Sequence, residues 1–248
     1  MGARDQHHPL DFLTNPERFM AFSRWAAPMF GVIAAILAAI GLVLTFAAPE
    51  DYQQGDTVRM MFIHVPAAII SMFVYFCLGI ASLLALIFRH ALADAAAVAC
   101  APLGAVFTVL ALATGSLWGK PMWGTWWVWD ARLTSVLVLL LFYLGYLALR
   151  SALEDEQKAA RAAAILALVG LINLPIIKFS VEWWNSLHQG SSTLFADPGD
   201  GLPPIYGTPL SLMVLGYMGL FGALWLVRIQ AEVWRRRAVV LALKAADA

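Results

Sequence analysis

The sequence alternates long apolar runs with short polar breaks. Six runs are close to the length of about 20 apolar residues that an α-helix needs to cross the hydrocarbon core of a bilayer. They cover residues 29–48, 65–88, 96–117, 133–149, 162–177 and 210–227. This pattern predicts an all-α membrane protein with six transmembrane helices, forming a single integral membrane domain over residues 1–248.

The composition agrees with a chain that folds in lipid. Hydrophobic residues make up 61% of the sequence and charged residues 13%, far from the averages of a soluble domain. The net charge is zero, so no overall basic excess indicates nucleic-acid binding. Cys77 and Cys100 both lie inside apolar runs, where we expect them to be packing residues rather than a disulfide.

The distribution of Lys and Arg predicts the orientation. Of the 16 basic residues, only Arg59, Lys120, Arg132 and Lys178 fall on the side that holds the odd-numbered loops. By the positive-inside rule both termini are therefore expected in the cytoplasm. The N-terminal segment 1–25 is too long and mixed for an ordinary cleaved signal, so we expect it to be cytoplasmic and the first helix to remain as an anchor.

This topology places three unusual segments on the outer face. They are the loop that ends near His64, the loop 118–132 and the loop 178–209. The middle loop contains Trp118, Trp123, Trp126, Trp127 and Trp129, followed by Asp130 and Arg132. An interfacial helix is one interpretation, since positions 123, 126, 127 and 130 share a helical face. The concentration of indoles on one side favours instead a flat surface for a large planar ligand.

Two histidines accompany these tryptophans. His64 comes shortly before Pro66, which fits the first turn of the second helix and leaves His64 just outside it. His188 follows Trp183 and Trp184 in the third outer loop. A single outer histidine is usually an interfacial hydrogen-bonding residue. Two of them beside a tryptophan platform could instead fill both axial positions of a haem iron.

Other polar residues carry weaker predictions. Lys120 and Arg132 could offer positive charge to haem propionates, and Asp130 could orient a ring N–H or the arginine. The remaining histidines, at positions 7, 8 and 90, are interpreted as solvated. The sequence has no C-x-x-C-H motif, so covalent attachment of a c-type haem is not expected.

The sequence also resembles a known family. Residues 123–134, Trp-Gly-Thr-Trp-Trp-Val-Trp-Asp-Ala-Arg-Leu-Thr, resemble the tryptophan-rich WWD signature of haem-handling proteins in cytochrome c biogenesis. With the His-Val-Pro segment at 64–66 and Trp-Trp-Asn-Ser-Leu-His-Gln at 183–189, nearly the whole chain is similar to the haem exporter protein C (CcmC) family. Other WWD proteins, such as the haem lyase F, are much longer.

The resemblance implies a role and a set of partners. His64 and His188 would ligate haem b, and residues 118–130 would form its platform on the periplasmic side of a bacterial inner membrane. The haem would pass to a periplasmic haem chaperone, protein E. The ABC-type subunits A and B and the small membrane protein D would be further partners.

Two other functions stay open on the sequence alone. One is a permease subunit for a different amphiphile, with interfacial histidines. The other is a bis-histidine electron carrier of the b-cytochrome kind. The sequence shows no nucleophile beside a base and no ATPase motif, so we expect a binding and transfer protein rather than an enzyme, with any ATP hydrolysis in a partner subunit.

Overall fold

The computed structural model describes residues 15–188 and 202–247, and within these ranges every long element is an α-helix. Six helical stretches are long and apolar enough to cross a membrane. They are Pro16–Ala47, Asp56–Phe88, Ala91–Trp123, Ala131–Ala152, Glu156–Trp183 and Pro204–Ala246. Each contains one of the six predicted runs almost entirely. The predicted all-α class with six spans is confirmed for the described residues.

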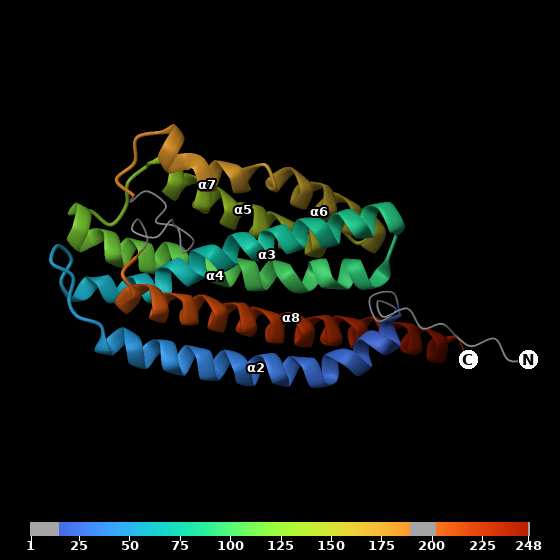
Figure 1. Ribbon diagram of the computed structural model, residues 1–248. Helices are drawn as coiled ribbons and strands as arrows, with labels where there is room; N and C mark the ends of the chain where they lie inside the picture. The colour runs from blue at the N-terminus through green and yellow to red at the C-terminus, as the bar shows by residue number, and fades with distance from the viewer. Residues whose placement is uncertain (1–14, 189–201, 248) are drawn as a thin grey trace, which may run out of the picture.

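The helices form a layered bundle (Figure 1). Helix α2 (Pro16–Ala47) packs along α8 (Pro204–Ala246), which in turn packs on α3 (Met61–Phe88) and α4 (Ala91–Trp123). On the other side of this central pair lie α5 (Ala131–Ala152), α6 (Glu156–Gly170) and α7 (Asn173–Trp183). The central pair α3 and α4 therefore contacts helices on both sides, and its ends are the natural place for an enclosed site.

Apolar side chains also cover much of the outside of the bundle. Val43, Phe46 and Val106 are between 65% and 72% exposed. In water such a surface would be unfavourable over this many residues, whereas lipid chains solvate it without cost. The exposed apolar residues agree with a multi-pass membrane protein.

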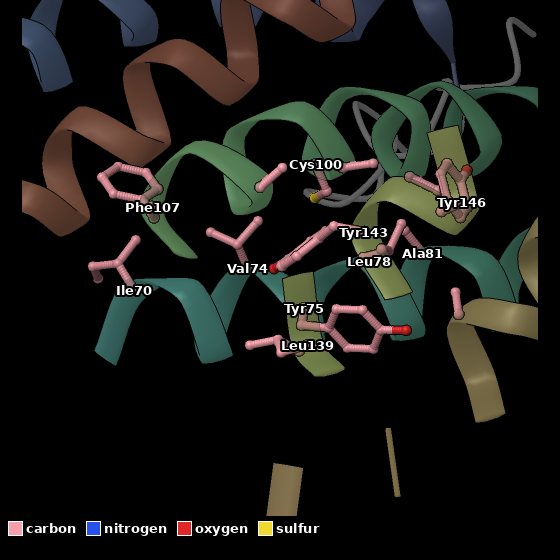
Figure 2. Close-up of a cluster of buried hydrophobic side chains, with 14 of the residues drawn as sticks. Ile70, Val74, Tyr75, Leu78, Ala81, Cys100, Phe107, Leu139, Tyr143 and Tyr146 are labelled. Carbon is pink, nitrogen blue, oxygen red and sulfur yellow. The ribbon is translucent and has the colours of Figure 1, made fainter. Parts of the chain in front are cut away.

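The core lies between α3, α4 and α5 (Figure 2). Val74 and Leu78 of α3 are fully buried there, facing Cys100 of α4 and Leu139 of α5. The hydroxyl of Tyr143 donates to the backbone oxygen of Ser71 at 2.7 Å, which satisfies a polar group in the apolar interior. Cys77 and Cys100 are both free, so their interpretation as packing residues is confirmed.

The helix ends differ from the predicted loops in three places. Helix α4 continues to Trp123 and stops at Gly124, whose φ of 72° suits a glycine C-cap, so the helical spacing of positions 123 to 130 is not realised. Helix α3 already begins at Met61, following the short 3₁₀ helix η1 (Asp56–Met60), so His64 lies inside its first turn and not outside it. The fifth span consists of two helices, because the chain turns at Leu171 and Ile172.

The end of the bundle remote from His64 is held by ion pairs. Asp94 at the start of α4 pairs with Arg150 at the end of α5 and with Arg236 of α8. Arg236 also pairs with Glu232 at 2.6 Å. His90, expected to be solvated, accepts a hydrogen bond from Ala93 N at 3.3 Å and caps α4. The side chain of His90 is partly exposed, and its capping role was not part of the sequence interpretation, although an imidazole just before a helix can accept from the free N–H groups of its first turn. His7 and His8 lie outside the described residues.

Candidate functional site

A cavity of about 380 Å³ lies at the other end of the bundle. It is formed by the first turns of α3 and α5, the last turns of α4, and α7 with the segment that follows it. This volume falls within the range of about 300–1,000 Å³ that is usual for small-molecule sites. Its deeper wall is apolar, with Ala68, Ile69 and Met72 of α3 facing Val136 of α5. The wall therefore suits a ligand with a large apolar surface.

His64 is fixed at this cavity by helix α4. Its Nδ1 lies 2.9 Å from the backbone oxygen of Ala111 and 3.3 Å from Oγ1 of Thr114. The hydroxyl of Thr114 donates to the oxygen of Leu110 at 2.6 Å. Since a carbonyl oxygen can only accept, Nδ1 carries the hydrogen, which leaves Nε2 with a free lone pair. Metal-binding histidines commonly have this arrangement, with one ring nitrogen held by a carbonyl and the other available to the metal.

His188 faces His64 across the cavity. It lies beyond the end of α7, and the centroids of the two imidazole rings are 6.4 Å apart, with the ring planes inclined at 40°. Bonds of about 2 Å from a metal to an imidazole nitrogen on each side would place two ring centroids about 6 Å apart. The observed separation of the two rings is close to that spacing.

Three of the predicted tryptophans line the cavity: Trp118, Trp123 and Trp127. The indole of Trp118 lies edge-on to His64, with a centroid distance of 5.7 Å, and that of Trp123 lies 6.3 Å from His188. Nε1 of Trp127 is buried and has no hydrogen-bond partner among the residues that the structure describes. The two imidazoles are thus each accompanied by an indole.

The other four predicted tryptophans do not line the cavity. Trp126 and Trp129 are 55% and 75% exposed, and Trp183 and Trp184 are at least half exposed. After Gly124 the chain leaves the helix, so neighbouring indoles point in different directions and only some of them turn inward. Lys120 lies over the ring of Trp126 at 5.8 Å, outside the cavity.

The two charged residues of the motif take different places. Asp130 does not line the cavity but is buried at the start of α5, where it accepts a hydrogen bond from Leu133 N at 2.7 Å. Arg132 does line it, and its guanidinium donates to Oγ of Ser180 at 3.1 Å and to the backbone oxygen of Lys178 at 3.2 Å. These two bonds hold a positive charge at the wall of the cavity.

Sequence reasoning missed several lining residues. Gln54 comes from the segment before η1, and Lys178 from α7. Gly115 of α4 lies against the ring of His64, since a Cβ built there would be 2.8 Å from its Cε1. The expected topology had already placed Gln54 and Lys178 on the outer side, which was a usable signal. Nothing in the sequence pattern indicated that Gly115 would contact a histidine.

The fold and the cavity define a class: a multi-pass helical membrane protein with a paired-histidine site at one end of its bundle. The sequence model of the family described as "Heme exporter protein C" matches residues 9–244, so the chain belongs to that family. It is 56% identical to "Heme exporter protein C" of Bradyrhizobium diazoefficiens over 225 residues, 91% of this chain and 85% of the relative.

Two further relatives carry the same name. The protein of Escherichia coli (strain K12) is 46% identical over 219 residues, 88% of each chain. That of Paracoccus denitrificans is also 46% identical, over 228 residues, 92% of this chain and 94% of the relative. The similarity thus extends over nearly the whole chain, and the range matched by the family model contains the segments that form the cavity.

Proposed function

We propose that this protein binds haem b in the cavity, with His64 and His188 as axial ligands of the iron, and delivers it to a periplasmic haem chaperone for the maturation of c-type cytochromes. The observation that carries the proposal is the pair of imidazoles of His64 and His188. Their ring centroids are 6.4 Å apart, and each ring lies beside an indole. Membership of the haem exporter protein C family supports the identity of the cargo.

The donor set suits haem in three respects. The Nδ1 contact with Ala111 leaves Nε2 of His64 available to iron. The apolar wall along α3 and the indoles of Trp118, Trp123 and Trp127 offer surface to the macrocycle. The charges of Arg132 and Lys178 at the same cavity would pair with the two propionates.

The location of the site supports transfer rather than permanent storage. The cavity lies at an end of the bundle, and His188 comes from a segment beyond α7 rather than from a helix. Trp126 and Trp129 are exposed next to it and offer an aromatic surface for a chaperone. We assign this end to the periplasm of a bacterial inner membrane, because most of the Lys and Arg residues gather on the opposite side.

The protein then acts as one component of an export system. Its role is to hold and hand over haem, not to catalyse a reaction. The ABC-type subunits A and B would hydrolyse ATP, and the small membrane protein D would complete the complex with protein E as acceptor.

Absorption spectra of the purified, haem-loaded protein test the proposal. Two neutral imidazoles should give a low-spin spectrum, and the extracted pigment should be unmodified haem b. His64→Ala and His188→Ala should each open a coordination position, weaken haem retention at least about tenfold and respond to added imidazole. His90→Ala, at the other end of the bundle, is the matched control and should leave the spectrum unchanged.

Transfer is measured by mixing the loaded protein with the purified apo-chaperone and following the haem in each. Failure of the wild type to bind haem, or an unchanged low-spin spectrum in both histidine variants, would overturn the site. Retention of all the haem in the presence of the chaperone and the ABC-type subunits would overturn delivery.

A further inference from the structure

The buried carboxylate of Asp130 joins two parts of the chain. One of its oxygens accepts from Leu133 N and caps α5. The other, Oδ2, accepts a hydrogen bond from the hydroxyl of Ser186. Oγ of Ser186 in turn accepts from the backbone N–H of His188 at 3.0 Å. Two consecutive hydrogen bonds therefore connect the start of α5 to the backbone of His188.

The two histidines are held in very different ways. His64 belongs to a helix of 28 residues, and its ring is bonded directly to α4 through Ala111. His188 lies beyond the last residue of α7, which ends where the N–H of Trp184 donates to the backbone oxygen of Ser180. Leu187, between Trp184 and His188, is 55% exposed. The segment that carries His188 is therefore secured less by packing than His64 is.

We infer that Asp130 is a positioning residue, which acts through Ser186 to hold His188 in the cavity. This inference rests on the proposed function, since it concerns the same haem site. It assigns Asp130 to the placement of a ligand rather than to haem itself, in agreement with its absence from the cavity wall.

Two hydrogen bonds carry the action of Asp130 to His188. The contact between Asp130 and Ser186 fixes the hydroxyl of Ser186, and that hydroxyl accepts from the backbone N–H of His188. Loss of either bond should change the placement of His188, while the contact of His64 with Ala111 in α4 is not involved.

Ser186→Ala tests the inference, because it removes the hydroxyl without touching the cap of α5. We expect a mixture of low-spin and five-coordinate haem, and loss of haem to a scavenging apo-globin about tenfold faster than in the wild type. Added imidazole should restore the low-spin spectrum. Ser186→Thr keeps a hydroxyl and should retain most of the low-spin spectrum and the slow haem loss of the wild type. Ser151→Ala, which removes a hydroxyl near the other end of α5, should behave as the wild type.

A double-mutant cycle separates an action through Ser186 from a direct one. Asp130→Asn preserves the cap, because asparagine is also favoured at the N-cap position, but it removes the charge. If Asp130 acts through Ser186, Asp130→Asn should change the spectrum and the rate of haem loss in the wild type and add nothing in the Ser186→Ala background.

The outcomes distinguish this inference from the proposed function. A wild-type protein without a low-spin haem spectrum contradicts the proposed function. A wild-type protein with that spectrum and a Ser186→Ala variant with the same spectrum and rate of haem loss contradict only the inference. Additive effects of Asp130→Asn and Ser186→Ala, or failure of Ser186→Thr to restore binding, would also overturn it.

Discussion

The indole N–H of Trp118, near the end of α4, donates a hydrogen bond of 2.9 Å to Oε1 of Gln54, which lies in the segment before α3. Gln54 is itself held by a turn, in which its N–H donates to Oδ1 of Asp51 at 2.8 Å. Trp118 lies edge-on to His64. A turn in the segment between α2 and α3 thus fixes the orientation of an indole at the cavity.

Gln54→Leu should therefore weaken haem binding. Leucine preserves much of the volume but leaves the N–H of Trp118 without its acceptor, a loss that we expect to raise the Kd for haem about three- to tenfold. Gln54→Glu keeps an acceptor and should bind nearly as the wild type does. Gln53→Leu, at the exposed neighbouring position, is the control. Equal titration curves for Gln54→Leu and the wild type would contradict the role of this bond.

The tryptophans should divide into two functional groups. Replacing Trp118, Trp123 and Trp127 together by alanine removes the aromatic wall of the cavity and should abolish stable haem retention, whereas single replacements by phenylalanine should be mild. Alanine at both Trp126 and Trp129 should leave the absorption spectrum intact and slow the transfer to the chaperone. A triple variant that binds and transfers haem normally would show that the cavity is not the haem site.

Lys178 should contribute to the affinity for haem by pairing its positive charge with a propionate. Lys178→Ala should lower the affinity for haem several-fold at low ionic strength, and less in high salt, because an exposed ion pair is screened. It should have no effect on the affinity for haem dimethyl ester, which lacks the two carboxylates. Lys120→Ala is the control, since Lys120 lies over Trp126 outside the cavity. An equal loss of affinity for haem and for its ester would assign Lys178 a packing role.

The orientation can be measured with reporter fusions. The excess of Lys and Arg on one side predicts that both termini are cytoplasmic. A reporter that is active only in the periplasm should therefore be inactive when it is fused after Ala248, and active when it is inserted at Tyr52, which is 90% exposed in the segment between α2 and α3. The reverse pattern would place the haem site on the cytoplasmic side.

The spans could be predicted from the sequence because a bilayer imposes one length and one polarity on every helix. The helix ends could not, since Trp118 to Trp123 look like a polar break but continue α4 until Gly124. The proximity of the two histidines also followed from the topology. The topology also placed Gln54 and Lys178 on the outer side, but not in the cavity, because only the packing of the helices decides which residues on one membrane face share it. The same applies to the exposed Trp126 and Trp129.

Gly115 gives the most local test of the site. A Cβ at this position of α4 would lie 2.8 Å from Cε1 and 3.2 Å from Nδ1 of His64, too close for either atom to stay in place. Gly115→Ala should therefore turn the imidazole and disturb its 2.9 Å contact with Ala111. We expect a partial loss of the low-spin spectrum and an affinity for haem about tenfold lower, while the protein remains folded.

A matched control separates this effect from a general effect of alanine in a helix. Gly222→Ala in α8 would bring a Cβ no closer than 3.7 Å to the ring of Phe30, an ordinary contact, and should leave haem binding unchanged. The double variant with His64→Ala should bind haem as His64→Ala alone does, because the ring that Gly115 accommodates is then absent. A wild-type spectrum and affinity in Gly115→Ala would show that the orientation of His64 in this cavity does not determine how haem is held.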